Sequence, residues 1–416
     1  MKDNQTKYPQ LRFKGFTDPW EKRTLGQTTT KAKSYSLSRD VERDHETGYR
    51  YIHYGDIHTG VADIVTEHTK LPNIEPANYD ELRVNDLVVA DASEDYQGIA
   101  EPAVVVGLPT HLVAGLHTIT LRPSSASSLY LYCLLHTDSF KHFGYQMGTG
   151  LKVFGISWSN LSKFTFMIPS RPEQEMIVKL IESVDNLIAV NQRKLAKLKE
   201  LKQGYLQKMF PQNGSKFPQL RFAGFADAWE ERKLTDLATT YIGLVTTMTE
   251  NYTTEGTLLI RNSDIKEGRF DLSNPIYLEE QFAEKNKTRR MKKGDVVTVH
   301  TGDIGTSAII NSELDGTIGF ATITTRPKKE LDSNFLAWYF NSNYHKKYAK
   351  RMSTGDGRSN YNMKDFNKNV IPTPKIAEQQ KIGSFFKQLD ETLALHQRKL
   401  EKLQELKKGY LQKMFC

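Results

Sequence analysis

One short stretch of this 416-residue sequence has the composition of a phosphate-binding loop. Residues 300–307 read HTGDIGTS, where glycines and hydroxyl side chains could surround an anion. The same residues are typical of a hairpin connection between two strands, and we favour that interpretation. A cationic run at 289–293, RRMKK, is compatible with a phosphate contact and equally with a solvent-exposed charged segment.

A second stretch approaches an enzymatic motif. Residues 274–277 read NPIY, one residue away from the Asn/Asp-Pro-Pro-aromatic motif of amino-methyltransferases, with Ile276 in place of the second proline. No glycine-rich cofactor loop follows a strand nearby. We therefore expect Asn274 and Pro275 to form a turn that leads into a strand.

The other familiar catalytic patterns are absent from the sequence. It contains no GxGxxG, no GxxxxGK[ST], no HExxH, no GxSxG and no Pro-Asp dipeptide that could anchor a nuclease core. The 11 histidines are scattered without metal-ligand spacing, so we expect His53, His58, His117, His136 and His300 to be ordinary core or surface residues. The sequence predicts no active site and no metal site in this chain.

Composition narrows the cellular setting. Lys and Arg number 57 against 49 Asp and Glu, which gives a net charge of +8, a modest excess for a nucleic-acid binder. Cys133 and Cys416 are the only cysteines and cannot form a disulfide framework, which indicates a reducing compartment. No apolar run approaches 18 residues and the start lacks a signal core, so we expect a cytoplasmic protein that does not enter the membrane.

Internal duplication organises the chain. YPQLRFKGFTDPWEKRTL at 8–25 matches FPQLRFAGFADAWEERKL at 217–234, and GLHTITLRP at 115–123 matches GFATITTRP at 319–327. RKLAKLKELKQGYLQKMF at 193–210 returns as RKLEKLQELKKGYLQKMF at 398–415. Between these joints, at about 35–165 and 240–370, only scattered positions agree, including Asp56 with Asp264. We interpret the chain as two modules that do one kind of job on two different targets; neutral drift is the alternative.

The two dissimilar centres look mixed α and β. Short β-branched runs predict strands at 86–90, 103–107, 118–121, 295–299, 307–310 and 321–325. Segments 127–143 and 332–348 have helical periodicity behind a serine or aspartate cap. Each centre then ends in a loop rich in Gly, Ser and Asn, followed by a proline-containing exit.

Each unit closes with a long amphipathic helix. The first runs without proline from Glu173 to about Met209, and steps of three and four residues give a coiled-coil seam. The predicted seam consists of Ile181, Val184, Ile188, Asn191, Leu195 and Leu198, and of Phe386, Leu389, Leu393, His396, Leu400 and Leu403. Asn191 and His396 occupy the same polar step, and we expect them either to meet or to contact solvent or a carboxylate. Lys202 and Lys407 also fall on the seam, where long side chains can extend outward to water.

The two helices are each other's nearest partners. Antiparallel pairing would place the two modules at opposite ends of a spacer, which we favour over parallel pairing. The predicted fold class is therefore α+β: a pseudo-twofold tandem repeat of two mixed α/β domains separated by two long helices in an antiparallel intramolecular coiled coil. The predicted boundaries are 1–170 and 211–373 for the domains, with 171–210 and 374–416 for the helices.

Together these features resemble the specificity subunit of a type I restriction–modification enzyme over the whole chain. The resemblance is carried by PQLRF-GF at both openings, by the Ile-Pro…Glu-Gln entry into each helix, including Glu173 and Glu378, and by the repeated helix endings. It implies a non-catalytic subunit whose two target-recognition domains each read half of an asymmetric bipartite site on double-stranded DNA. The paired helices would space the domains and seat two modification (methyltransferase) subunits, which restriction and translocase subunits join. S-adenosylmethionine, ATP and Mg²⁺ would belong to those partners.

For DNA contacts we select the glycine-rich loops and the polar side chains beside them. The candidates are Gln146, Lys152, Ser157 and Trp158 in the first unit, and Lys347, Arg351, Arg358, Ser359, Asn360 and Tyr361 in the second. Arginine and asparagine can read guanine and adenine edges, whereas Lys347 and Arg351 are assigned to phosphates. A solvated loop is the alternative for each residue. Two other functions stay open: a stand-alone DNA adenine methyltransferase acting through NPIY, and a structural coiled-coil adaptor.

Overall fold

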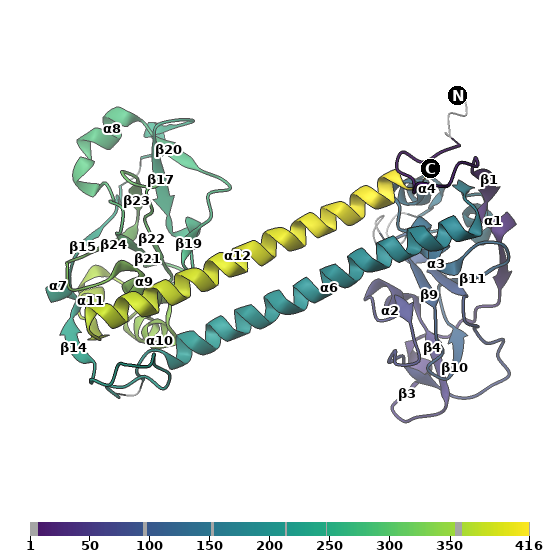
Figure 1. The fold of residues 1–416 in the computed structure, drawn as a ribbon, viewed down its shortest axis with the longest axis horizontal. Coiled ribbons are helices and arrows are strands. Elements are labelled where there is room, and N and C mark those ends of the chain that lie inside the picture. Colours follow the sequence, from purple (N-terminus) through teal and green to yellow (C-terminus); the bar gives the residue numbers. More distant parts are fainter. Residues whose placement is uncertain are drawn as a thin grey trace. The chain divides into compact units, whose positions relative to one another are not determined.

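The computed structural model describes residues 7–94, 98–150, 154–212, 214–246, 248–353 and 360–415 (Figure 1). The chain forms two compact units. The first unit comprises residues 1–191 and 399–416, and the second comprises 192–398. Each unit thus contains one α/β domain, the first part of one long helix and the last part of the other. No helix in the described part of the chain is long and apolar enough to span a membrane.

The domain of the first unit contains two two-stranded sheets, β1-β13 and β12-β8, and two larger sheets. The strand orders of the larger sheets are β2-β11-β7-β9-β5 and β10-β4-β6-β3. The strands are β1 Glu21–Thr24, β2 Thr29–Ala32, β3 Glu42–Arg43, β4 Tyr49–Ile52, β5 Ile64–Val65, β6 Asn73–Ile74, β7 Leu87–Ala90, β8 Ala92–Ser93, β9 Pro102–Val105, β10 His111–Ala114, β11 Thr118–Pro123, β12 Phe154–Gly155 and β13 Thr165–Ile168. The helices are α1 Leu25–Thr28, α2 Tyr54–His58, α3 Ser128–Leu135, α4 Asp138–Met147 and α5 Trp158–Leu161, with a 3₁₀ turn at Arg39–Val41.

The second unit repeats this plan. Its two four-stranded sheets have the orders β15-β24-β21-β22 and β16-β20-β17-β23, and β14-β25 and β18-β19 form two-stranded sheets. The strands are β14 Glu230–Lys233, β15 Ala238–Ile242, β16 Tyr252–Thr253, β17 Thr257–Arg261, β18 Ile265–Lys266, β19 Arg269–Phe270, β20 Ile276–Leu278, β21 Val296–Val299, β22 Ser307–Ile309, β23 Ile318–Phe320, β24 Thr322–Pro327 and β25 Val370–Thr373. The helices are α7 Leu234–Leu237, α8 Glu280–Lys285, α9 Ser333–Asn341, α10 Asn343–Met352 and α11 Met363–Phe366, with 3₁₀ turns at Thr249–Asn251, Asn262–Asp264 and Lys287–Arg289.

The predicted central strands are confirmed as β7, β9, β11, β21, β22 and β24. Each predicted central helix is instead two helices, because a hydroxyl side chain starts a new one. Thr137 accepts a hydrogen bond from the Phe140 amide and begins α4. Ser342 accepts one from the His345 amide and begins α10. Helical periodicity continues through both breaks, which is why the sequence pattern did not separate them.

A buried aspartate in each unit explains why the arginine of the repeated TITLRP and TITTRP strands is present in both. In the first unit Arg122 donates to both oxygens of Asp86, at 2.8 and 2.6 Å. In the second, Arg326 donates to both oxygens of Asp295, at 2.8 and 2.7 Å. Each pair joins the start of a central strand to the end of its antiparallel neighbour, so the repeated Asp and Arg residues fix strand register rather than a binding site.

The two long helices are α6, Arg171–Lys208, and α12, Ile376–Lys413, each of 38 residues. Within each unit their segments are antiparallel. In the first unit Lys407 of α12 pairs with Asp185 of α6 at 2.7 Å, while Met414, just past the end of α12, shares a core with Ile177, near the start of α6. Such pairing runs the end of one helix along the start of the other.

In the second unit Lys202 of α6 pairs with Asp390 of α12 at 2.7 Å, and Tyr205 packs edge-on against Phe385. Lys202 does not extend to water as we expected. It is 7% exposed, and its ammonium lies 4.3 Å from the centroid of the Trp338 ring. The Asp390 carboxylate balances this charge, and burial raises the pKa of Asp390.

All of the predicted seam residues are buried or half-buried in the structure. At the polar step, the Asn191 amide donates to the Leu187 carbonyl one turn earlier, at 2.7 Å. This bond satisfies the buried amide locally. The contact of Asn191 with His396 stays a prediction.

The repeated helix endings enter the cores of the α/β domains. Met414 and Phe415 lie in the core of the first unit, where Phe415 stacks on Tyr130 with ring centroids 5.1 Å apart. Met209 and Phe210 occupy the corresponding place in the second unit. Figure 1 shows the yellow end of α12 entering the first domain beside α4, and the end of α6 beside α10 in the second. The QKMF ending therefore anchors each helix in a domain.

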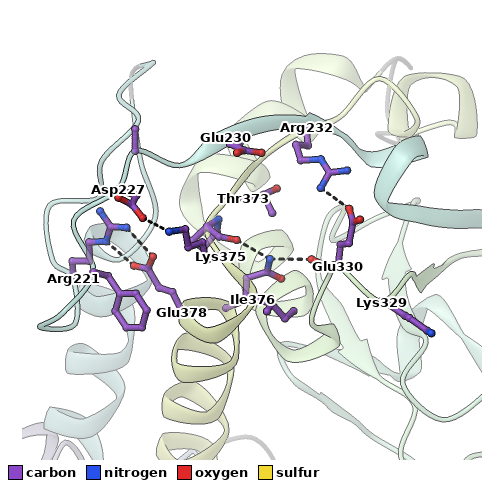
Figure 2. Close-up of a pocket in the computed structure, with 14 residues that line it drawn as sticks. Arg221, Asp227, Glu230, Arg232, Lys329, Glu330, Thr373, Lys375, Ile376 and Glu378 are labelled. Atoms are coloured by element: carbon purple, nitrogen blue, oxygen red, sulfur yellow. Dashed lines mark hydrogen bonds and ion pairs between the residues drawn. The ribbon is translucent and has the colours of Figure 1, made fainter.

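The repeated opening motif joins both long helices to each domain. In the second unit Arg221 donates to both oxygens of Glu378, near the start of α12, at 2.7 and 2.8 Å (Figure 2). The adjacent Leu220 amide donates to the carbonyl of Lys208 at the end of α6. One dipeptide thus holds the start of one helix and the end of the other.

The first unit makes the same junction. Arg12 donates to Glu173 of α6 at 2.7 and 2.9 Å, and the Leu11 amide donates to the carbonyl of Lys413 in α12. The hydrogen bond with Glu173 raises the pKa of Arg12. The glutamine after each glutamate completes the junction. The Gln174 side chain accepts a hydrogen bond from the backbone amide of Ser127, just before α3, at 2.8 Å. The Gln379 side chain accepts one from the backbone amide of Asp332, just before α9.

Candidate nucleic-acid interface

The candidate residues of the first unit lie around α4 and α5. Gln146 is exposed on α4, 3.0 Å from the His142 ring nitrogen. Ser157 is exposed and caps α5 by accepting from the Asn160 amide. Trp158 is half-buried and packs partly against the domain core. Lys152 lies outside the described residues. Two of these side chains, Gln146 and Ser157, are therefore open to a ligand.

In the second unit α10 presents Lys347 and Arg351 on its exposed surface. Asn360 is also exposed, and its backbone bridges to Thr301 in the 300–306 connection. The Asn360 side-chain oxygen lies 3.2 Å from His300 Nδ1. Arg358 and Ser359 lie outside the described residues.

Tyr361 is corrected from a DNA contact to a core residue. Its side chain is 0% exposed, and its hydroxyl accepts a hydrogen bond from Asn369 at 2.5 Å. The ring packs edge-on against Phe366, and burial raises the pKa of its hydroxyl. Position in a polar loop had suggested exposure, but the side chain points inward and anchors the end of that loop.

In each unit, an equivalent backbone hydrogen bond joins the end of the glycine-rich loop to the residue that follows a central strand. The Ile156 amide donates to the carbonyl of Asp91 at 2.9 Å, and the Tyr361 amide donates to the carbonyl of His300 at 2.8 Å. Asp91 directly follows β7 and His300 directly follows β21. The two units therefore present different side chains on equivalent backbone positions.

Sequence reasoning missed His300 as an organising residue of this surface. The ring is 9% exposed; Nδ1 faces Asn360 and Thr301, and Nε2 has no partner within the described residues. Its amide approaches the Asn262 side chain, which also donates to the Ala321 carbonyl at 2.9 Å. The only sequence signal for His300 is its alignment with Asp91, since each residue directly follows an equivalent strand of its unit.

Backbone strain marks the same place in both units. His117 and Ala321 have positive φ angles of 54° and 49°, although neither is glycine. They are equivalent positions of the repeated GLHTIT and GFATIT segments. The His117 ring is exposed and lies 3.1 Å from the Asp91 carboxylate, beside the loop that Ile156 closes. This polar pair is the first unit's counterpart of the His300 region.

The other candidate motifs prove structural. HTGDIGTS connects β21 to β22, which pair antiparallel, so the predicted hairpin is confirmed. Ser273 and Asn274 form a bend, and Pro275 leads from it into β20. In RRMKK, Arg289 donates to the Ile242 carbonyl and Arg290 to the Gly316 carbonyl, while Met291 is buried. No cluster of three or more potential metal ligands occurs among the residues that the structure describes.

Acidification is expected to weaken the second unit through His345. Burial lowers the pKa of this histidine to about 4, while an unfolded histidine titrates near 6.5. The unfolded chain therefore binds the proton first, and stability should fall by up to about 3 kcal/mol as the pH drops from about 6.5 to about 4. Phe140 holds the equivalent place in α4, so His345→Phe should remove most of the loss in urea titrations at pH 7 and 4.5. His68→Gln, at an exposed site, should leave it unchanged.

The fold defines a tandem α/β protein whose two domains share one framework and differ at their loops. Comparison with known proteins then identifies it: residues 17–200 and 226–405 match the type I restriction modification DNA specificity domain, and the chain belongs to that family. It is 22% identical to the putative type I restriction enzyme MjaX specificity subunit of Methanocaldococcus jannaschii, covering 84% of this chain and 83% of that protein.

Two further similarities extend over most of the chain. The type I restriction enzyme MjaVIII specificity subunit of the same organism is 20% identical, over 94% of this chain and 91% of the relative. A crystal structure of a type I restriction–modification S subunit from M. genitalium has a TM-score of 0.58 at 16% identity, covering 98% and 99% of the two chains. The likeness to that structure supports the predicted fold of two α/β domains with long paired helices.

Proposed function

We propose that this chain is the non-catalytic DNA-reading subunit of a cytoplasmic type I restriction–modification complex. Each α/β domain reads one half of an asymmetric bipartite site on double-stranded DNA. One observation carries this proposal: the two units share the helix junctions and the Asp–Arg strand pairs, yet differ in the side chains that they expose around α4 and α10. A common frame with unlike surfaces suits two readers with different targets.

The contacts proposed for reading lie on those surfaces. Gln146, Ser157 and Asn360 are exposed and carry groups that can bond base edges, while Trp158 offers part of its ring. Lys152, Arg358 and Ser359 keep their proposed roles from sequence alone. Lys347 and Arg351 are assigned to phosphates, and Tyr361 is withdrawn.

Two modification subunits are proposed to bind the long helices, and restriction and translocase subunits to join through them. Exposed apolar side chains outside the seam support such a seat: Leu187, Val190 and Leu406 in the first unit, and Leu201 and Leu395 in the second. S-adenosylmethionine, ATP and Mg²⁺ are assigned to the partners, where the methyltransferase flips and methylates an adenine.

Exchange of one reader tests the proposal. Residues 35–165 would be replaced by the same segment of a relative, and methylated sites would be mapped in cells that also carry the modification and restriction subunits. We expect one half of the methylated sequence to change and the other half and the adenine chemistry to persist. An unchanged methylated sequence would refute the assignment of reading to this segment.

The two alternatives give different results with the wild-type chain. A stand-alone methyltransferase would bind S-adenosylmethionine without its partners, but the NPIY segment is occupied by a bend and by β20, which pairs with β16 and β17. A structural adaptor would show no salt-dependent binding to duplex DNA, whether or not the partners are present.

A further inference from the structure

The helix before each variable loop differs sharply in charge between the two units. In α10 of the second unit, Lys346, Lys347, Lys350 and Arg351 occur without any acidic residue. In α4 of the first unit, one cation, Lys141, is balanced by one acid, Asp138. The two helices follow the same kind of buried helix and begin at the same kind of hydroxyl cap. The difference therefore concerns charge and not fold.

The charged residues of α10 occupy the same helix positions as uncharged residues of α4. α10 buries His345 and Ala349, and α4 buries Phe140 and Gly144 at the same two steps. Beyond the first turn, the exposed residues are Lys347, Lys350 and Arg351 in α10, and His142, Tyr145 and Gln146 in α4. Residues spaced by three and four lie together on a helix surface, so the three cations of α10 form one patch.

Nothing acidic neutralises this patch within the described part of the chain. Lys346, at its edge, approaches Glu267 at 3.6 Å. The Arg351 guanidinium lies 5.7 Å from the Tyr348 ring centroid, and no ion pair forms with Lys347, Lys350 or Arg351 among the residues that the structure describes. Like charges at this spacing repel and cost stability, which a bound polyanion would offset.

The patch also adjoins the proposed reading surface. Gly305, in the connection that begins at His300, lies against His345 and Ala349 on the inner face of α10: a Cβ added there would meet the Ala349 Cβ at 3.5 Å. The same connection bridges to Asn360 through Thr301. The connection after His300 thus contacts both the inner face of α10 and the backbone of Asn360, the residue proposed to contact bases.

We propose that α10 binds the phosphates of the second half-site, while α4 gives its half-site no comparable charge. The second reader then supplies most of the salt-dependent affinity, and the first reader binds chiefly through uncharged contacts such as those of Tyr145 and Gln146. This inference rests on the proposed function, and it names an inequality between the two readers that the shared framework does not predict.

The test is the salt dependence of DNA binding by the complex of this chain with its modification subunits, on duplex DNA carrying the mapped site. The variant Lys347→Gln/Lys350→Gln/Arg351→Gln should reduce the slope of log K against log salt by about 2–3, because each lost phosphate contact removes about 0.9. Wild type should then lose roughly 40-fold more affinity than the variant between 50 and 200 mM salt. The methylated sequence should stay the same.

Matched substitutions in α4 provide the control. His142→Gln/Tyr145→Gln should leave the slope unchanged, and His142→Lys/Tyr145→Lys/Gln146→Arg should increase it. An unchanged slope in the α10 variant, with unaltered circular dichroism and assembly, would overturn the inference. Weakened assembly at constant slope would also overturn it and would assign the patch to an acidic partner surface. If wild type shows no salt-dependent duplex binding, the proposed function itself fails.

Discussion

Glu378→Gln is expected to destabilise the second unit by about 3 kcal/mol. The Glu378 side chain is 1% exposed and accepts both hydrogen bonds of the Arg221 fork, whose hydrogen bond with Glu378 raises the pKa of Arg221. An amide of the same shape removes the charge and one acceptor, and leaves a mostly buried guanidinium without compensation. The junction that Figure 2 shows would loosen at the start of α12.

Urea titration of the full chain measures this loss, and hydrogen exchange assigns it to one unit. Glu173→Gln should have the same effect on the first unit, because Arg12 forms the equivalent fork there. Glu21→Gln is the matched control: its pair with Arg23 is largely exposed, and its loss should cost less than about 0.5 kcal/mol. Equal costs for Glu21→Gln and Glu378→Gln would show that the buried junction adds nothing.

The arrangement of two units and two long helices could be predicted from the sequence, because it produces internal repeats and a regular spacing of apolar residues. The seam spacing identified both helices, and the equality of the joints identified two units. The reason for that equality was not visible. The resemblance assigns the paired helices to partner docking, and the structure in addition uses Arg12, Arg221, Phe210 and Phe415 to hold each unit together. No local pattern reveals that Arg12 reaches a glutamate 161 residues away.

The candidate interface was less predictable, for a physical reason. Loop composition gives the types of side chain but not the side of the backbone on which each emerges. Asn360 and Tyr361 are neighbours, yet one is exposed and the other fully buried. The break between α9 and α10 was missed because Ser342 fits both a helix interior and a cap. That break sets the direction of α10, and so determines which of its cations face outward.

Removal of residues 414–416 is expected to disrupt the first unit, although that unit consists mainly of the other end of the chain. Met414 is 2% exposed and Phe415 is 9% exposed within its core. Phe415→Ala alone should cost about 3–4 kcal/mol, because a large apolar side chain leaves a cavity against Tyr130. The truncation removes both side chains and should cost more.

Hydrogen exchange should then rise in α3, which carries Tyr130, while α9 keeps its protection. Phe210→Ala is the matched variant: it removes the equivalent side chain, which packs against Phe335 and Tyr339, and should expose α9 instead. If truncation leaves α3 protected, the ending of α12 is only a helix terminus. If it behaves as expected, the first domain is complete only when α12 has been made, so synthesis of α12 precedes formation of a stable first reader.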